Sequence, residues 1–522
     1  MSPVDTAPDQ ASPDEDGAGR PAAPADWRRL DRRTVLLAAL VTAGVAAGAA
    51  VPTTLGLSGR FGFGPAVAWV LTGAAALIAF GAGADYVRWR RTRYRVGADR
   101  VELHTGLLLV KKRSLARERI RSVDLTAHLL QRVLGLVTVR IGTGEHTGSE
   151  STLELDPVLR AEGERLRRAL LERGLTATSG SHVEGELVAL DPRWIRYAPV
   201  SFVAPALAGA AAGAVMQVSD WFGAQGQVIE WIEERYRDTS LLSVIVLLAV
   251  AAVAAGVIGA LGLWVEKWWN YRMEREPGGT LRVRRGLLTS RSVTIEERRL
   301  RGVDLVEPLG VRLMGAARLD AITTGLAKDD EEQHGDHNTL LPPAPRPLAD
   351  AVAAAVLRET ASPTGAPLTA HPVAARGRRL RRALWAVLVP VLVQALLGAR
   401  LTPVLLWIAL GCAVGGLPVG VLLARDAYRA LGHALSGAYL VTRSGALRRS
   451  TAALERAGVI GWTVRQSYFQ RQAGLLSITA TTAAGAGAYT VYDAEASEGL
   501  GFAAEAVPGL LEPFLERVAA GE

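Results

Sequence analysis

The chain has 522 residues, of which 49% are hydrophobic, 21% are charged and one, Cys412, is a cysteine. A single cysteine excludes an intrachain disulfide and a cysteine-based metal cluster, so the fold needs no oxidising compartment. High apolar content together with a net charge of +8 indicates that apolar and charged segments are separated along the chain.

Residues 1–26 are mostly proline, alanine, aspartate and glycine, with almost no large apolar side chain. Such a composition cannot bury enough surface to fold, which predicts a disordered, mildly acidic tail. The first apolar segment begins after Arg33 and is longer than the core of a signal peptide. We therefore expect an uncleaved membrane anchor.

Six apolar stretches are long enough, or nearly so, to cross a bilayer as a helix, which takes about 20 residues. They form close pairs, so the sequence predicts three transmembrane hairpins at residues 34–84, 198–265 and 383–424. The fifth stretch is the shortest. The predicted spans are residues 34–59, 61–84, 198–218, 241–265, 383–399 and 401–424.

Arginine clusters flank the hairpins on one side. They precede the first span, follow the second and precede the fifth, whereas the hairpin tips carry few cations. Lysine and arginine are enriched on the cytoplasmic side of membrane helices. We therefore expect a multi-pass protein of the cell membrane with both termini and all soluble parts in the cytoplasm.

The six predicted spans contain no Asp, Glu, His, Lys or Arg. Ionisable residues within a membrane usually mark proton relays, ion paths or catalysis. Their absence argues against a coupled transporter and against an intramembrane hydrolase. A channel with a hydrophobic or lipid path needs no charge and stays open as an alternative.

One spacing occurs three times: a glycine, an arginine 26 positions later and a second glycine 29 positions after the first. Each copy follows a predicted hairpin, which predicts one soluble module repeated at residues 86–175, 268–359 and 426–518. The repeated residues are Gly106, Arg132 and Gly135, then Gly286, Arg312 and Gly315, then Gly445, Arg471 and Gly474.

Within each module, short alternating apolar segments predict strands around these glycines. A final strand is expected at residues 152–155, 338–341 and 489–492, and a closing amphipathic helix at residues 158–172, 347–359 and 507–518. Several short strands closed by one helix describe a small β-sandwich or partly open barrel. The fold class is therefore membrane α plus β, with three repeats of a transmembrane helix hairpin and a β-module.

Four features together resemble the bacterial pleckstrin-homology (PH) membrane proteins of the YdbS/YdbT type. These are the helix hairpin, the basic-aromatic stretch from Tyr86 to Tyr94, the Arg-Glu-Arg-Ile-Arg-Ser-Val-Asp segment from Arg117 to Asp124, and the Leu-Leu-Gln-Arg-Val-Leu-Gly-Leu segment from Leu129 to Leu136. Three copies match the longer, YdbT-like members. The resemblance implies PH-like modules and a non-enzymatic role.

Two modules depart from the shared pattern. Val311 stands where the other modules have Gln131 and Gln470. Thr463 stands in the third module where the first two have an aspartate, Asp124 or Asp304. A ligand site common to all three modules is therefore not expected.

The strongest basic patch outside the spans lies in the first module. Juxtamembrane cations are attracted to an anionic leaflet by roughly 1 kcal/mol each. The patch either sets topology and leaflet attraction alone or recognises an anionic lipid or a partner; nucleic acid is not expected. Its residues are Arg88, Arg90, Arg91, Arg93, Lys111, Lys112 and Arg113.

The three repeated arginines allow two interpretations. A guanidinium can hold a phosphate through two hydrogen bonds, which would make them anion ligands. Alternatively they belong to a turn framework in which each arginine bonds turn carbonyls and each glycine adopts a positive φ. The drift of the surrounding residues favours the framework.

The acidic and histidine-rich segment at residues 329–337 is the only cluster with metal-ligand residue types. His334, Asp336 and His337 lack a further spaced ligand or a catalytic signature, which favours a solvated loop over a divalent-ion site. We expect no metal, no cofactor and no catalytic residue.

The sequence thus favours a platform for interaction or assembly in envelope maintenance or stress defence, as the resemblance implies. Three tethered modules gain avidity for one partner or for the leaflet. We expect as partners the lipid bilayer and a membrane protein, with a shorter one-repeat relative as the leading candidate. The alternatives are a channel or transporter-like component gated by the modules, and an enzyme using the loop from His334 to His337.

Overall fold

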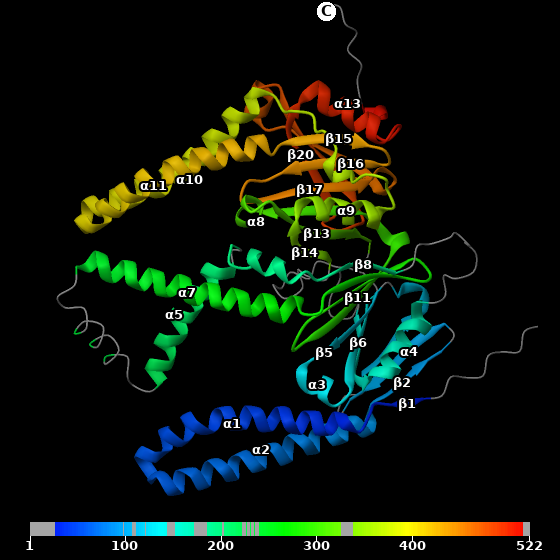
Figure 1. Cartoon of the computed structure of the whole chain (residues 1–522), viewed down its shortest axis with the longest axis vertical. Coiled ribbons are helices and arrows are strands. Elements are labelled where there is room, and N and C mark those ends of the chain that lie inside the picture. The colour runs from blue at the N-terminus through cyan, green and yellow to red at the C-terminus, as the bar shows by residue number, and fades with distance from the viewer. Residues whose placement is uncertain are drawn as a thin grey trace, which may run out of the picture.

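The computed structural model describes residues 27–97, 99–106, 111–120, 122–142, 152–171, 185–200, 203–221, 240–324 and 338–514, together with Gly226, Glu230 and Glu234. Figure 1 shows three β-modules stacked in chain order, with a pair of long helices extending from the same side of each.

The long helices pack in consecutive pairs along the chain. The first pair turns at Gly62, whose φ of 81° lies in the region that glycine tolerates best. Within the described residues, the extensive helix contacts all lie inside a pair. The pairs are α1 (Arg33–Phe61) with α2 (Phe63–Arg91), α5 (Val203–Trp221) with α7 (Leu241–Trp268), and α10 (Val373–Arg400) with α11 (Pro403–Arg429).

Five helices in the described part of the chain are long and apolar enough to cross a membrane, namely α1, α2, α7, α10 and α11. The predicted span at residues 198–218 overlaps α5, which begins later, at Val203, and is not one of the five. Residues 198–200, which the prediction includes in the span, are not helical, and Tyr197 directly before them is buried in the core of the second module. The residues before α5 therefore belong to the second module.

The first module contains two sheets, a short helix and a closing helix. Val101 and Leu103 alternate inward from β3, as the sequence pattern predicts. Its elements are β1 (Arg28–Arg29), β2 (Arg93–Val96), β3 (Arg100–Thr105), β4 (Lys111–Ala116), η1 (Arg117–Arg119), β5 (Ser122–Ala127), α3 (Leu129–Val133), β6 (Leu136–Gly142), β7 (Thr152–Leu159) and α4 (Arg160–Leu171).

The second module repeats this order and has the largest continuous core. Its closing helix buries four residues at helical spacing, from Ala349 to Val356. Its elements are β8 (Gly185–Ala189), η3 (Pro192–Tyr197), β9 (Arg272–Glu276), β10 (Thr280–Arg285), β11 (Ser290–Glu296), η4 (Glu297–Arg299), β12 (Leu300–Pro308), α8 (Leu309–Leu313), β13 (Ala316–Thr323), β14 (Thr339–Pro345), α9 (Arg346–Leu357) and η5 (Pro363–Gly365).

The third module follows the last helix pair and repeats the order again. Its elements are β15 (Gly432–Ser436), β16 (Tyr439–Ser444), β17 (Arg448–Glu455), η6 (Arg456–Gly458), β18 (Val459–Arg465), α12 (Tyr468–Gln472), β19 (Leu475–Thr482), β20 (Ala488–Glu495), α13 (Ala496–Ala506) and η7 (Glu512–Phe514).

The closing helix of the third module was placed wrongly by the sequence. It is α13, which ends where the predicted helix at residues 507–518 begins. Two glycines make this segment a weak helix former in isolation. Gly499 nevertheless packs closely against the sheet, because a Cβ there would lie 3.0 Å from Leu476 Cδ1 and 3.1 Å from Ile478 Cδ1. Packing therefore decides the helix.

Two sheets run across module boundaries, which the sequence did not reveal. One has seven strands in the order β7-β6-β5-β11-β10-β9-β8, and another has six in the order β14-β13-β12-β17-β16-β15. Strand β5 thus joins the first module to the second, and β12 joins the second to the third. The described residues of the three modules form one hydrogen-bonded row (Figure 1).

Candidate functional site

A row of basic residues crosses the first sheet where it meets the membrane helices. Arg29 on β1 lies opposite Arg93 on β2, which lies opposite His104 on β3, which lies opposite Lys112 on β4. Residues opposite one another in neighbouring strands share a face of the sheet. We refer to these four residues as the cationic row.

Like charges directly opposite one another destabilise a sheet. The other modules have fewer basic residues at this register. The second module has one opposed pair, Arg272 and Arg284, with Ala189 and Ser292 at its ends, and the third has Arg443 between Gly432 and Thr451. Only the first module therefore has a basic residue at each described position of the row.

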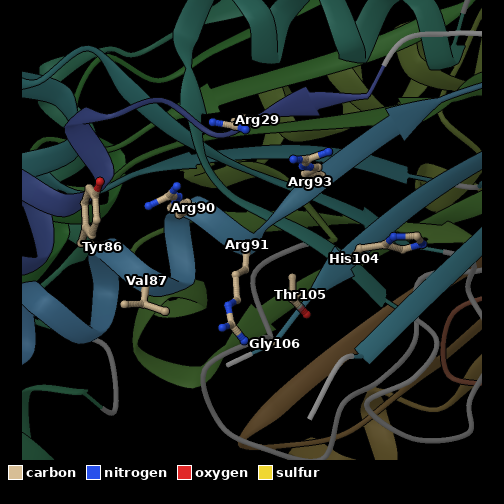
Figure 2. Close-up of a pocket in the computed structure, with 9 residues that line it drawn as sticks. All are labelled: Arg29, Tyr86, Val87, Arg90, Arg91, Arg93, His104, Thr105 and Gly106. Atoms are coloured by element: carbon tan, nitrogen blue, oxygen red, sulfur yellow. The ribbon is translucent and has the colours of Figure 1, made fainter. Parts of the chain in front are cut away.

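A pocket of about 620 Å³ opens beside the cationic row. In Figure 2 its arginines come from β1, from the last turn of α2 and from β2, and Arg91 extends toward Gly106. None of the described residues that line it is acidic. The lining consists of Arg29, Tyr86, Val87, Arg90, Arg91, Arg93, His104, Thr105 and Gly106.

Aromatic contacts hold His104, the third residue of the row, in place. Trp27 lies against His104 with ring centroids 4.4 Å apart, and the Arg95 guanidinium lies 5.0 Å from the Trp27 ring. Cation–π contacts of this kind stabilise by about 0.5–1 kcal/mol at exposed sites. They orient the imidazole at the mouth of the pocket.

The predicted basic patch is only partly gathered at this pocket. Arg90, Arg91 and Arg93 line it. Arg88 instead lies 3.5 Å from Asp85 in an ion pair and lines a separate pocket of about 400 Å³. The remaining cations are all on β4, which pairs with β3: Lys111, Lys112 and Arg113.

Sequence reasoning missed Arg29 and His104 as pocket residues. Arg29 was assigned only to membrane topology, because it precedes the first span and lies far from β2 in the chain. Its role depends on the two-residue strand β1 pairing with β2, and such a short strand has no detectable periodicity. His104 lies two residues before Gly106, and its alternation with the buried Leu103 was the available signal.

Two of the three repeated arginines contact the next unit of the chain, and the third contacts a residue of its own module. The Arg132 guanidinium donates to the carbonyl of Leu287 in the second module. Arg312 forms an ion pair of 2.6 Å with Asp426 at the end of α11. Arg471, in the last module, lies over the Tyr468 ring at 5.8 Å.

The repeated glycines have the positive φ values that the framework interpretation requires. Gly135, Gly315 and Gly474 have φ angles of 71°, 70° and 64° at the turn after the short helix. Gly286 is also fixed by space, since a Cβ there would lie 1.9 Å from the Thr289 carbonyl oxygen.

The aspartates shared by the first two modules lie at the module junctions. Asp124 on β5 accepts a backbone hydrogen bond from Thr294 on β11, and burial raises the pKa of Asp124 to about 7. Asp304 on β12 accepts a hydrogen bond of 2.6 Å from Ser450 on β17, and burial raises its pKa to about 6. Each is buried against the next module.

The segment with His334, Asp336 and His337 lies outside the described residues. Within the part of the chain that the structure describes, no group of three His, Cys, Asp or Glu side chains could hold a metal ion. The described residues that line the pocket include four arginines, Arg29, Arg90, Arg91 and Arg93. Arginine forks around a pocket suit a phosphate group, which each guanidinium can hold by two hydrogen bonds.

Comparison with known proteins gives a family and one relative. A family model described as "Bacterial PH domain" matches residues 39–174, 206–360 and 386–501. The UPF0699 transmembrane protein YdbT of Bacillus subtilis (strain 168) is 23% identical over 273 residues, which cover 50% of this chain and 55% of that protein. The match thus spans about half of the relative's length. No solved structure gives a significant match.

Proposed function

This chain belongs to the Bacterial PH domain family, and we propose that it is a membrane-anchored, non-enzymatic platform for assembly in envelope maintenance or stress defence. In this proposal the helix pairs fix three PH modules as a row at the cytoplasmic leaflet. The first module contacts phosphate-bearing headgroups there, and the row presents a surface to partner proteins.

The observation that carries this proposal is the pairing of strands between modules. Strand β12 pairs with β17 over seven residue pairs, from Gly302 with Leu454 to Pro308 with Arg448. Modules that share sheets cannot rotate independently, unlike domains joined by linkers. A rigid row holds its binding surfaces at fixed spacing, which is what a platform requires.

Exposed apolar residues support an arrangement of the row along the membrane. The short helix after each junction strand exposes large apolar side chains, including Val133 and Leu313 at 78% each and Phe469 at 62%. Figure 1 shows α3 and α8 on the side from which the long helices extend. Exposed apolar groups beside membrane helices are stabilised by contact with the bilayer interface.

The cationic row supports contact between the first module and an anionic leaflet. It lies beside the end of α2, where Arg90 and Arg91 leave the predicted span. A phosphate would relieve the repulsion between Arg93 and Arg29, which lie opposite each other. Phosphate-bearing lipid headgroups are the anions present at that depth.

A channel formed by the helix pairs receives less support. The extensive contacts of the described helices lie within pairs, so the chain alone does not enclose a common path (Figure 1). Solute flux through liposomes that contain the purified chain, at a rate above protein-free liposomes, would favour the channel.

Distances between spin labels test the platform. Ala161, Ala351 and Glu505 are exposed positions on the closing helices of the three modules. Cysteine at two of these positions, in a Cys412→Ala background, allows pairwise labelling in lipid nanodiscs. One narrow distance distribution for each pair is expected, while broad distributions would show independently moving modules and overturn the proposal.

A further inference from the structure

The two ends of the row of modules differ in a way that identifies a docking site. In the described residues, β5 and β12 each pair on both sides, with their own module and with the next one. Strand β18 is their counterpart in the third module, and it pairs only with β19. The last junction strand thus has an open edge.

The register of the two filled junctions is the same. Leu125 lies opposite Ser292, and Leu305 lies opposite Thr451. Each leucine is 19 residues after the first repeated glycine of its own module. The residue opposite each leucine is six residues after the first repeated glycine of the following module. Val464 on β18 has the same position in the third module as these leucines have in theirs. The register of the two filled junctions, which we call the template register, therefore specifies how a further strand would align with β18.

Burial confirms that β18 resembles a junction strand without its neighbour. Leu125 and Leu305 are 6% and 0% exposed, whereas Val464 is 42% exposed. The next residue along each strand shows the same difference: Val306 on β12 is 1% exposed, whereas Arg465 on β18 is exposed. An exposed strand edge with apolar side chains is a template for pairing with another chain.

The free edge at the other end of the row is protected. Strand β4 is the counterpart of β11 and β17, and it pairs only with β3 in the described residues. It carries Lys111, Lys112 and Arg113, although the whole chain has only four lysines. Lysine on an edge strand is a common device against unwanted pairing.

Charge disfavours a second copy of this chain as the occupant of β18. The template register would place Arg465 opposite Lys111 and Val464 opposite Lys112. Like charges opposite one another are destabilising, and neither filled junction has two cations in opposite positions. At these positions β17 has Ser450 and Thr451, whereas β11 has Arg291 opposite the uncharged Thr126. Because β18 has Arg465 where β5 has Thr126, the acceptable strand has small uncharged residues there, as β17 has.

We infer that the open edge of β18 binds the first-sheet edge strand of a PH module carried by another membrane protein. The partner's strand has small, uncharged residues where β4 has Lys111, Lys112 and Arg113, and it aligns in the register of the filled junctions. The added module continues the row along the same leaflet, so its own membrane anchor enters the same bilayer. This inference rests on the proposed platform and names its partner.

A grafted strand tests the inference on the full chain. The variant Lys111→Ser, Lys112→Thr and Arg113→Ala gives β4 the residues of β17 at the same register. In detergent, analytical ultracentrifugation is expected to show a monomeric natural chain and a variant that forms head-to-tail oligomers with rising concentration. Adding Val464→Lys on β18 is expected to restore the monomer.

Two controls make the result specific. Replacing three exposed arginines away from any edge, Arg165→Ala, Arg272→Ser and Arg298→Thr, removes the same charge and should leave a monomer. Cysteines at Val464 and Lys112, in a Cys412→Ala background that also carries Lys111→Ser and Arg113→Ala, should cross-link between chains.

Three outcomes would overturn the inference: a monomeric graft, oligomers that persist with Val464→Lys, or a natural chain that self-associates through β18. The first two leave the spin-label distances unaffected, so they reject the docking site without rejecting the platform. Broad distances would reject the platform itself.

Discussion

Ser450 of the third module donates a hydrogen bond of 2.6 Å to Asp304 of the second. The first junction has the same acidic position, where Asp124 accepts from the backbone of Thr294. Neither carboxylate serves its own module alone, since each faces a strand of the following one. The free energy of these junctions therefore depends on two buried carboxyl groups.

The first prediction concerns the pH dependence of the junction at Asp124. Burial raises its pKa from the ordinary value of 3.8 to about 7, so the folded state binds a proton that the unfolded state releases. This contribution is present in full below about pH 4 and is lost as pH rises toward 7. The difference corresponds to at most about 4 kcal/mol.

Asp124→Asn should remove this contribution. Thermal unfolding in detergent, followed by tryptophan fluorescence at pH 5 and pH 8, measures it as the difference between natural chain and variant. We expect the variant to gain relative stability at pH 8. An equal effect of the substitution at both pH values would contradict the assignment.

The second prediction concerns a buried histidine pair beneath the third helix pair. His371 Nε2 lies 3.0 Å from His433 Nδ1, and burial, followed by the nearby His433, lowers the pKa of His371 to about 4. Burial also lowers the pKa of His433, although Glu498 lies 3.9 Å from its Nε2 atom. Arg379 is the nearby cation, and it too disfavours protonation.

Stability from this pair is present above pH 6.5 and is lost as pH falls toward 4, because the unfolded histidines take up protons first. His371→Gln should reduce the loss of thermal stability between pH 7 and pH 5. His128→Gln, at an exposed histidine of the first module, is the matched control and should leave the loss unchanged. If both substitutions act alike, the buried pair is not its cause.

The third prediction concerns the attachment of the third module to α10. Asp493 is fully buried, pairs with Arg378 and lies 3.2 Å from Arg379. Asp493→Asn leaves two arginines without their buried carboxylate, which should cost about 3–5 kcal/mol. Asp85→Asn breaks an exposed pair with Arg88 and should cost about 0–1 kcal/mol.

Chemical unfolding in detergent compares these two variants with the natural chain. Hydrogen exchange should localise the Asp493→Asn effect to β20 and the start of α10. If both substitutions lower the free energy of unfolding equally, the buried pair stabilises the fold no more than the pair between Asp85 and Arg88.

The fourth prediction separates ligand binding from stability in the cationic row. Arg93→Ser removes the arginine that lies opposite Arg29 on one side and His104 on the other. Without lipid, the variant should be more stable than the natural chain by up to about 1 kcal/mol, since the repulsion is relieved. In nanodiscs with phosphatidylglycerol, native mass spectrometry should show fewer retained anionic lipids.

Arg272→Ser is the matched control, because Arg272 has the equivalent register position in the second module. It should not change lipid retention. Loss of stability in Arg93→Ser together with unchanged lipid retention would indicate a purely structural arginine.

The sequence revealed those features that depend on local pattern. The spacing from Gly106 to Gly135 recurred in every module, and the family model matches three segments that include these repeats. The strands after Gly135 and Gly315 were predicted from alternation, and they appear as β6 and β13. Alternation of apolar residues indicates which face of a strand is buried. This signal is local, so it predicts strands within each module.

Relations between distant segments were not predictable in the same way. Alternation in β5 shows that Leu125 is buried, but it does not show that Ser292 lies opposite in another module. Local helix propensity disfavours α13, since the segment contains two glycines. The contact between Gly499 and Leu476 joins residues of different elements, so local propensity does not report it. The sequence shows that Thr463 stands where the first two modules have an aspartate. Only the structure shows that those aspartates face the next module and that the strand of Thr463, β18, has no such neighbour in the described residues.

Hydrogen exchange of the junction strands tests the central claim most directly, namely that the modules form one row with an open last edge. In the full chain in nanodiscs, the amides of β5 (Ser122–Ala127) and β12 (Leu300–Pro308) are hydrogen-bonded between two strands, whereas β18 (Val459–Arg465) has one neighbour. The account predicts slow exchange in β5 and β12 and fast exchange at alternate amides of β18. Exchange in β5 and β12 as fast as in β18 would contradict it.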